Sequence, residues 1–210
     1  MRGRFITFEG AEGVGKTTQV AHAVTHLRAR GIVPVVTREP GGTALAERLR
    51  RLVLEPEDGP VDPSTELLLI FAARANHVAR VIRPALARGQ WVLCDRFTDA
   101  TVAYQGGGSG MNEAWIRQLA RIAHPRLEPD LTLLLDAEPE VALGRRAGRG
   151  QRADRFESED AAFFARVRAR YLAIAAAEPA RVRVIDAGVS EAEVAAAISR
   201  AIDFALPGRP

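Results

Sequence analysis

Residues 10–17 of the chain spell GAEGVGKT, which matches the phosphate-binding pattern G-x-x-x-x-G-K-[ST] at every defined position. This pattern constrains the fold strongly, because its glycines belong to a sharp turn between a buried strand and a helix. An apolar run at Phe5–Phe8 precedes the motif. Val20, Val24 and Leu27 follow it at helical spacing. The segment is therefore predicted to hold the phosphates of a nucleoside triphosphate at a helix N-terminus.

Lys16 is the only lysine of the chain, and every other basic side chain besides histidine is arginine. A lysine kept under this bias indicates a role that arginine cannot fill. A compact ammonium can bridge the β- and γ-phosphates inside a tight backbone loop, where a planar guanidinium is too bulky. Thr17 is predicted to offer its hydroxyl to Mg²⁺. The residues expected to bind ATP are Gly10, Ala11, Glu12, Gly13, Val14, Gly15, Lys16, Thr17 and Thr18.

Strand and helix patterns alternate along the whole chain. Apolar runs predict strands at 4–9, 32–37, 90–94, 131–136 and 182–186. Helical spacing predicts helices at about 16–30, 43–54, 64–88, 111–123, 139–147, 160–178 and 190–205. Strands that are apolar at consecutive positions, as at Leu131–Leu135, are typical of a parallel sheet covered on both faces. We therefore predict an α/β fold of the P-loop NTPase kind, a five-stranded parallel sheet flanked by helices, as one domain over residues 1–210.

Glycine- and proline-rich stretches at 55–63, 106–108 and 148–150 are predicted to be internal loops, because strand and helix patterns resume after each. No apolar run is long enough to predict a membrane span, and no signal-peptide pattern precedes the first strand, so a cytoplasmic location is expected. Cys94 is the single cysteine and is expected in the core. The charge of +3 and the pI near 9.7 would be compatible with a nucleic-acid-binding protein. The arginines are dispersed, however, and a phosphate-binding enzyme needs such residues anyway.

Two aspartates follow apolar strands and compete for the metal position. Asp95 is followed directly by Arg96, which places a carboxylate beside a guanidinium at the carboxyl end of a strand. That pair suits a phosphate and its metal in one crevice. Asp136 precedes Pro139, which has the place of a first helical residue, so Asp136 also fits an acidic helix start. Spacing favours Asp95 as the ligand of Mg²⁺.

Four blocks of sequence resemble the thymidylate kinase family, and the resemblance runs nearly from end to end. The first is the phosphate-binding loop at 10–18, which by itself would fit many families. The second is TREPGGT at 37–43, and the third joins DRF at 95–97 to AYQ at 103–105. The fourth runs from 145 to 157. The second and third blocks are diagnostic, and the resemblance implies transfer from ATP to dTMP with Mg²⁺, by a homodimer.

The resemblance also implies an acceptor site built from separate segments. Its expected residues are Glu12, Arg38, Glu39, Pro40, Arg50, Phe71, Arg74, Arg96, Thr101, Tyr104 and Gln105. The loop at 38–40 is expected to border the monophosphate, which Arg50 and Arg96 would grip. Arg50 has the family's spacing from Arg38, although its position also fits a solvent-facing helix arginine. Glu12 is expected at the sugar 3′-hydroxyl.

Phe71 and Arg74 are three positions apart and share one helix face. In the family an aromatic ring here stacks on thymine, while the arginine reaches the O4 edge and discriminates between bases. Judged without the resemblance, Phe71 would be assigned to the core.

Three further residues are implied around the nucleoside. Thr101 and Gln105 are expected to contact the base, and Tyr104 to crowd the sugar 2′ position, which favours deoxyribose. The family commonly has a serine where this chain has Ala100, so one polar contact near the base is expected to be absent.

No arginine follows Glu12 in the phosphate loop, where one subclass of the family carries its catalytic arginine. The glycine-flanked basic segment at about 145–157 instead resembles the lid of the other subclass. Arg149 and Arg155 are expected to neutralise charge on the transferring phosphoryl group, with Arg145 in support. The segment is one residue longer than the family pattern, which leaves the assignment of individual arginines open.

Together these features predict an ATP:dTMP phosphotransferase that serves dTTP synthesis, with ATP and dTMP as small-molecule substrates and neither nucleic acid nor membrane as a partner. The catalytic residues would be Lys16, Arg96, Arg149 and Arg155. Alternatives are another deoxynucleotide or deoxynucleoside kinase of this fold, a P-loop switch or partition ATPase, and a nucleic-acid-binding protein. Two arginines expected to bind the acceptor phosphate, Arg50 and Arg96, favour a nucleoside monophosphate over a nucleoside as the acceptor. The four histidines lack zinc-binding spacing.

Overall fold

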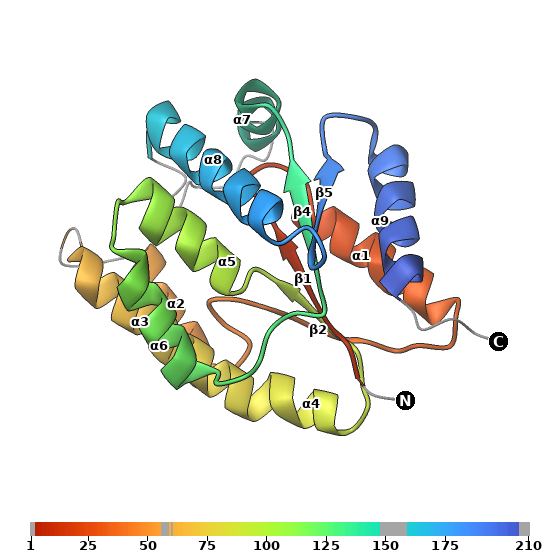
Figure 1. Ribbon diagram of the computed structural model, residues 1–210, viewed down its shortest axis with the longest axis horizontal. Helices are drawn as coiled ribbons and strands as arrows, with labels where there is room; N and C mark the ends of the chain where they lie inside the picture. Colours follow the sequence, from red (N-terminus) through yellow and green to blue (C-terminus); the bar gives the residue numbers. More distant parts are fainter. Residues whose placement is uncertain (1–2, 56–58, 60, 148–158, 206–210) are drawn as a thin grey trace.

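Five parallel strands form one sheet in the middle of the molecule (Figure 1). The computed structural model describes residues 3–55, 59, 61–147 and 159–205. The strands are β1 (Phe5–Glu9), β2 (Val35–Arg38), β3 (Val92–Asp95), β4 (Leu131–Asp136) and β5 (Val182–Asp186). Their order is β2-β3-β1-β4-β5, and every neighbouring pair is parallel. The predicted α/β fold with a five-stranded parallel sheet is therefore confirmed.

Helices fill the segments between the strands. Between β1 and β3 these are α1 (Lys16–Arg28), α2 (Ala44–Leu54), α3 (Pro63–His77), the π-helical η1 (Val78–Ile82) and α4 (Arg83–Ala87). Next come α5 (Thr98–Thr101), the π-helical η2 (Val102–Gly108), α6 (Glu113–Ala123), α7 (Pro139–Ala147), α8 (Ala161–Ala177) and α9 (Glu191–Ala205). Within the described ranges, none of these helices combines the length and the apolar character that crossing a membrane requires.

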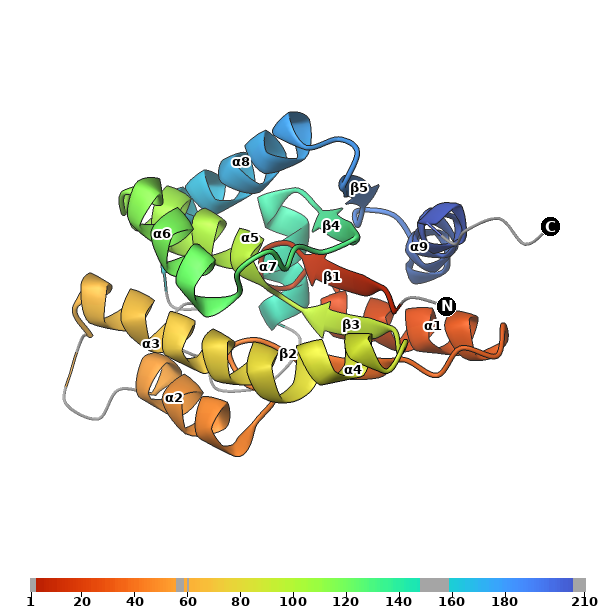
Figure 2. The same cartoon turned by 60° about the horizontal axis from the view of Figure 1, so that its bottom comes forward.

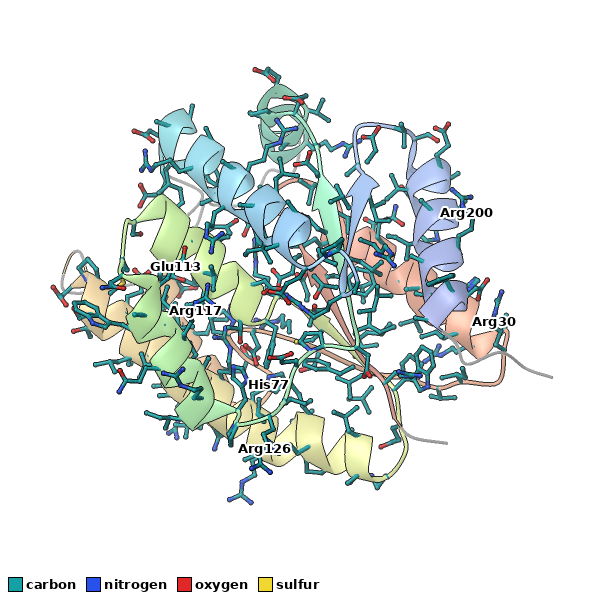
Figure 3. The ribbon with its side chains drawn as sticks, viewed as in Figure 1. Arg30, His77, Glu113, Arg117, Arg126 and Arg200 are labelled. Carbon is teal, nitrogen blue, oxygen red and sulfur yellow. The ribbon has the colours of Figure 1, made fainter. Side chains whose placement is uncertain are left out.

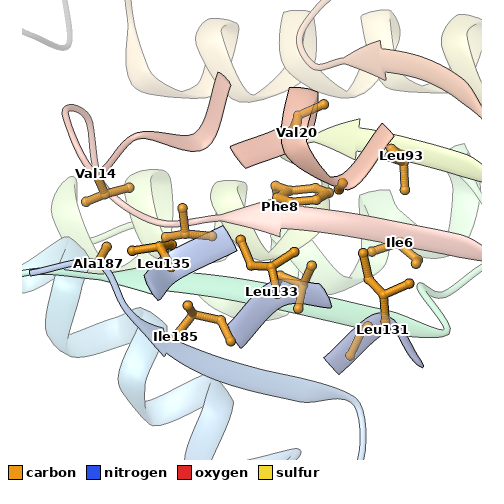
Figure 4. Packing of buried hydrophobic residues seen from close by; sticks show 14 of the residues in the cluster. Ile6, Phe8, Val14, Val20, Leu93, Leu131, Leu133, Leu135, Ile185 and Ala187 are labelled. Carbon is orange, nitrogen blue, oxygen red and sulfur yellow. The ribbon is translucent and has the colours of Figure 1, made fainter. Parts of the chain in front are cut away.

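One face of the sheet packs against α1 and α9. Ile6 and Phe8 of β1 lie on this face with alternate residues of β4, because successive strand residues point to opposite sides (Figure 4). Leu27 of α1 and Ile198 of α9 close the cluster, and neither is exposed. This face carries the main apolar core beneath the phosphate-binding loop.

The opposite face of β1 carries Phe5, Thr7 and Glu9. Thr7 Oγ1 lies 2.8 Å from Oγ1 of Thr132 in β4. Glu9 accepts a hydrogen bond from the hydroxyl of Tyr171 in α8. Figures 1 and 2 show α8 beside α5 and its continuation η2 on this side of the sheet. The carboxylate that ends β1 is therefore enclosed between the sheet and these helices.

Predicted boundaries in the first half of the chain differ from the structure by one to three residues. The strand predicted at 32–37 covers Val35–Arg38. Pro34 has no N–H to give to a ladder, so pairing with β3 begins when the N–H of Val35 donates to the carbonyl of Trp91 at 2.7 Å. The helix predicted at 64–88 is present as a continuous helical run from α3 to α4, widened to a π-helix over η1.

The loop predicted at Gly106–Gly108 is wrong, because these residues end the helical segment formed by α5 and η2. The glycines serve close packing. A Cβ on Gly108 would lie 2.5 Å from the ring of Phe163 in α8, and one on Gly107 would lie 2.6 Å from Cβ of Arg170. The run was taken for a turn because glycine disfavours helix in isolation, whereas here helix–helix contact decides.

The carboxyl ends of β1, β2 and β3 meet at one edge of the sheet. The phosphate-binding loop leaves β1 there, Glu39 follows β2, and Arg96 follows β3. From β1 the chain passes to β2 on one side, while β4 lies on the other side of β1. In open α/β sheets such a reversal of strand order creates the crevice in which ligands bind.

Candidate active site

Gly10, Gly13 and Gly15 shape the loop between β1 and α1. All three have positive φ, at 133°, 85° and 92°, which residues with a Cβ seldom adopt. A Cβ on Gly10 would also lie 2.3 Å from the carbonyl oxygen of Leu135 in β4. No side chain caps the first N–H groups of α1, which begins at Lys16. Those donors and the positive end of the helix dipole are therefore left for an anion.

The Lys16 ammonium lies over this loop and donates to the carbonyl oxygens of Gly10 and Ala11 at 3.1 and 2.8 Å. Its side chain is buried. Burial, together with the nearby charge of Arg96, lowers the pKa of Lys16, although Glu12 acts in the opposite direction. A buried ammonium in this state gains stabilisation from an added anion, which suits a phosphate-binding role.

A hollow beside the start of α1 is lined by both Thr17 and Asp95. Asp95 Oδ1 is buried and has no hydrogen-bond partner among the described residues. A cation would satisfy this oxygen, and hydroxyl and carboxylate oxygens are ligands that Mg²⁺ prefers. Asp136, the competing aspartate, is occupied, because Arg168 donates to its two carboxylate oxygens at 2.8 and 2.9 Å. The residues at Asp95 therefore fit the metal better.

A pocket of about 510 Å³ opens next to the phosphate-binding loop. It is lined by Glu12, Glu39, Pro40, Arg50, Leu54, Ile70, Arg74, Arg96, Ala100, Thr101, Tyr104 and Gln105. Every residue predicted to bind dTMP belongs to this lining except Arg38 and Phe71. Segments far apart in the sequence thus converge on one acceptor pocket.

Arg96 connects this acceptor pocket to the phosphate-binding loop. Its Nη1 donates to the carbonyl oxygen of Gly10 at 3.1 Å, and its Nη2 donates to Glu12 Oε1 at 2.5 Å. Nη2 also donates to the hydroxyl of Tyr104 at 3.0 Å, and the guanidinium carbon lies 4.7 Å from the centre of that ring. A permanent positive charge is therefore fixed between the phosphate-binding loop and the acceptor pocket.

Arg74 and Glu39 form a buried ion pair at the other end of the acceptor pocket, 2.6 Å from Nε to Oε2. Nη2 of Arg74 donates to Thr101 Oγ1 at 3.0 Å, whereas Nη1 is buried without a partner among the described residues. Burial raises the pKa of Glu39, but Arg74 and His77 outweigh it and hold that pKa below its usual range. His77, labelled in Figure 3, is fully buried and also contacts Thr37 at 2.7 Å.

Gln105 is oriented by a carboxylate. Its Nε2 donates to Oε1 of Glu66 at 2.8 Å, and both residues are buried. A carboxylate can only accept, so the amide must turn its NH₂ toward Glu66. With its NH₂ turned to Glu66, the amide presents Oε1 on its other side, and Gln105 lines the acceptor pocket. The pocket therefore offers a donor from Arg74 and an acceptor from Gln105.

The family model for thymidylate kinase matches residues 8–198 of this chain. The chain belongs to the thymidylate kinase family. It is 58% identical over 198 residues to a thymidylate kinase of Chromohalobacter salexigens, across 94% of this chain and 93% of that protein. A thymidylate kinase of Pseudomonas syringae pv. tomato is 56% identical over 200 residues, across 95% of each chain. The crystal structure of thymidylate kinase from Ehrlichia chaffeensis matches with a TM-score of 0.78 and 33% identity, across 96% of this chain and 99% of that one.

Phe71 lies outside the acceptor pocket, although the resemblance to the thymidylate kinase family implied that its ring contacts the base. Phe71 is 3% exposed, packs with Leu67 and Ile116, and is absent from the pocket lining. Ile70, one position earlier on α3, lines the pocket instead. The ring of Phe71 supports Arg74, whose guanidinium carbon lies 4.8 Å from the ring centre. The structure therefore brings Ile70 rather than Phe71 to the pocket wall, and the stacking role of Phe71 stays a prediction.

Arg38 also lies outside the acceptor pocket. It lines the neighbouring hollow that holds Thr17 and Asp95, and its Nη2 donates to Glu47 at 2.9 Å. Arg50 is placed as predicted, since it lines the acceptor pocket and its Nη1 donates to the carbonyl of Pro40 at 3.0 Å. Arg50 and Arg96, the two arginines expected to grip the acceptor phosphate, both line the acceptor pocket, whereas Arg38 does not.

The lid arginines of the thymidylate kinase resemblance, Arg149 and Arg155, lie outside the described residues. Arg145 precedes them in α7, and its Nη1 donates to the carbonyl oxygen of Ala187 at 2.7 Å. That bond joins α7 to the loop after β5.

Ile70, Tyr171 and Glu9 are among the residues near the thymidylate kinase site that sequence reasoning missed. Ile70 looked like core, and Tyr171 lies in an apolar stretch of α8 with no motif to mark it. Glu9 did carry a signal, because a carboxylate directly after the apolar residues 5–8 is expensive to bury without a partner.

Proposed function

We propose that this chain transfers the γ-phosphoryl group of ATP to dTMP and forms ADP and dTDP. The observation that carries the proposal is the position of Arg96, which lines the acceptor pocket while its Nη1 bonds the phosphate-binding loop at Gly10. A donor phosphate on that loop and an acceptor phosphate at Arg96 would be neighbours. Family membership over nearly the whole chain agrees with this reaction.

The nucleophile is a phosphate oxygen of dTMP, which is already anionic and needs no strong general base. Rate enhancement then comes from alignment of the two phosphates and from positive charge around the transferring group. Lys16 and Arg96 would supply that charge from fixed positions. Mg²⁺, held by Thr17 and Asp95 with phosphate oxygens and water, would neutralise charge on the β- and γ-phosphates.

The polar groups at the base end favour thymine over cytosine. Thymine presents an acceptor at O4 and a donor at N3–H, which complement the unpartnered Nη1 of Arg74 and the Oε1 acceptor of Gln105. Cytosine presents a donor and an acceptor at these positions, so both contacts would be mismatched. We assign Tyr104, which is 5% exposed, to the 2′ side of the sugar and Glu12 to its 3′-hydroxyl.

We assign completion of the charged shell to Arg149 and Arg155, with Lys16 and Arg96 as the described catalytic residues. The support is the resemblance of segment 145–157 to a lid and the lack of an arginine after Glu12 in the phosphate-binding loop. A lid that excludes water would prevent loss of the phosphoryl group by hydrolysis.

We also propose that the chain forms a homodimer through α3 and α6. Trp115 and Ile122 are seven positions apart on one face of α6 and are 54% and 71% exposed. Leu68 on α3, which packs beside α6, is 56% exposed. Exposed apolar side chains of this size on two neighbouring helices favour a partner surface. A cytoplasmic location remains a prediction.

The test is ADP formation from ATP and Mg²⁺ with dTMP, dUMP, dCMP, thymidine or no acceptor. We expect rapid ADP formation with dTMP, little with dCMP or thymidine, and almost none without an acceptor. ADP formation without an acceptor would identify a P-loop ATPase instead. Preference for thymidine over dTMP would mean that Arg50 and Arg96 do not bind an acceptor phosphate.

A further inference from the structure

Arg96 has a backbone conformation that its own residue type disfavours. Its φ is 70°, in the left-handed region, although it is not glycine. Such a conformation persists only where surrounding contacts over-determine it, and it is concentrated at functional sites. The contacts that hold Arg96 therefore bear on how it works.

Glu9 supplies one of these contacts from beneath. Its carboxylate is fully buried, and Oε1 accepts the backbone N–H of Phe97, the residue after Arg96, at 2.7 Å. Oε2 accepts the hydroxyl hydrogen of Tyr171 at 2.8 Å. One carboxylate thus ties the chain next to Arg96 to helix α8.

Tyr171 extends this contact to the guanidinium. A phenol has one hydrogen to donate, and here it goes to Glu9. The oxygen lone pairs of Tyr171 are then free to accept from Nη1 of Arg96, 3.2 Å away. With Glu9 ionised, the order Glu9, Tyr171, Arg96 is therefore set by the donor and acceptor count of each group.

A neutral oxygen between a carboxylate and a guanidinium has a useful consequence. A carboxylate bound directly to Arg96 cancels much of its charge, as Glu12 does at 2.5 Å. If Glu12 turns to the sugar hydroxyl of a bound nucleotide, Tyr171 still orients Arg96 without neutralising it. The full positive charge then faces the phosphate, in a fixed direction.

We propose that Glu9 and Tyr171 are positioning residues that aim Arg96 at the acceptor phosphate. Neither residue lines the acceptor pocket, so both act through Arg96. The inference rests on the proposed function, which assigns Arg96 to the phosphate of dTMP.

Tyr171→Phe removes the hydroxyl and keeps the ring that packs against Tyr104, 6.4 Å between centres. We expect kcat/KM for dTMP to fall roughly tenfold to hundredfold, because a hydrogen bond to a charged group is lost from the catalytic geometry. The KM for ATP should stay within about twofold, since no contact of Lys16 changes. A general loss of structure would instead alter both substrates alike.

Thr7→Val is the matched control. Thr7 lies two positions before Glu9, on the same face of β1, and its buried hydroxyl bonds only Thr132 among the described residues. This variant removes a buried hydrogen bond from the same strand without touching Arg96. We expect lower thermal stability with unchanged kcat/KM for dTMP.

Glu9→Gln tests the same contact independently of the tyrosine. Its amide can still accept from Phe97 N–H, but it then presents NH₂ to Tyr171 and turns the phenol hydrogen toward Arg96. We expect a loss in kcat/KM similar to that of Tyr171→Phe, and little further loss in the double variant. In an Arg96→Ala background, Tyr171→Phe should have no further effect.

The wild-type assay separates this inference from the proposed function. ADP formation that depends on dTMP supports the function, and the variants then decide the role of Glu9 and Tyr171. Values of kcat/KM within twofold of wild type for both Tyr171→Phe and Glu9→Gln would overturn the inference. Additive losses from Arg96→Ala and Tyr171→Phe would overturn it too, because Tyr171 would then act without Arg96.

Discussion

At the scale of single residues, the crevice contains buried polar groups that the protein leaves partly unpaired. They belong to Arg74, Lys16 and Asp95. Nη1 of Arg74 and Oδ1 of Asp95 have no partner among the described residues, and the pKa of Lys16 is lowered by burial and then by Arg96. Such groups destabilise a fold unless something else satisfies them. Their concentration around one crevice is the physical signature of a ligand site.

Lys16→Met should abolish phosphoryl transfer and leave the fold intact. The substitution keeps the length of the side chain but removes the cation from the loop at Gly10 and Ala11, so kcat should fall by roughly a thousandfold. The free energy of unfolding should not decrease, since a buried charge is removed. Steady-state kinetics and urea unfolding would check both, and near-normal turnover would refute the assigned role.

Glu66→Gln should weaken discrimination between dTMP and dCMP. A glutamine at position 66 can accept or donate, so the Gln105 amide is no longer obliged to present Oε1 to the pocket. The ratio of kcat/KM for dTMP to that for dCMP should fall by roughly tenfold. The dTMP to dUMP ratio is the internal control, because both bases carry the same N3–H and O4. A constant dTMP to dCMP ratio would show that Glu66 does not orient Gln105.

At the scale of elements, the helical segment from α5 to η2 carries four residues of the pocket wall, Ala100, Thr101, Tyr104 and Gln105. Its closeness to α8 depends on glycine. The carbonyl of Gly108 also accepts two hydrogen bonds from Arg166 of α8, at 3.1 and 2.9 Å. Packing between these two helices therefore sets one wall of the acceptor pocket.

Gly108→Ala should destabilise the protein by about 1–3 kcal/mol, because the new Cβ would lie 2.5 Å from the ring of Phe163. Gly106→Ala is the matched control. A Cβ there would meet its nearest atoms at 3.4 Å, and alanine favours helix over glycine, so stability should hold or rise by about 0.5–1 kcal/mol. Urea unfolding would compare the two. Equal losses would mean that helix propensity, rather than contact with α8, controls this segment.

At the scale of the whole molecule, Glu9 couples pH to stability. Burial, and next the charge of Asp99, raise the pKa of Glu9 from 4.5 to about 7, although Arg96 and the hydrogen bonds from Tyr171 and Phe97 oppose the shift. Between these two values the folded chain holds a proton that the unfolded chain has lost. Stability from this group is therefore complete below pH 4.5 and is lost as pH rises through about 7.

Glu9→Gln should remove this dependence. Relative to wild type, the variant should gain stability as pH increases from 5 to 8, by roughly 3 kcal/mol at the upper end, because the buried charge no longer has to form. Over the same pH range, the kcat/KM of the variant for dTMP should fall relative to that of wild type, so stability is gained at the expense of activity. Urea unfolding at several pH values would measure the difference in the free energy of unfolding between variant and wild type. The other titrating groups are common to both proteins, so their contributions cancel. A difference that is constant with pH would contradict the raised pKa.

The sequence by itself determined the features that depend on local pattern. The glycines and Lys16 of residues 10–17 required a turn between strand and helix, and consecutive apolar residues in β4 required a sheet covered on both faces. Asp95 was favoured over Asp136 because Arg96 follows it directly, whereas Asp136 precedes a helix start at Pro139. These conclusions needed only short-range geometry, so they were accessible without the fold.

The tertiary structure alone decided which side chains reach the crevice and how charges are shared there. Ile70 rather than Phe71 faces the pocket because the rotation of α3 is set by packing of Phe71 against Ile116 of α6, more than 40 positions away. The pairing of Asp136 with Arg168, and of Glu9 with Tyr171, likewise joins residues from separate strands and helices. Partners so distant in the chain leave no periodic trace in the sequence, so only the folded molecule reveals them.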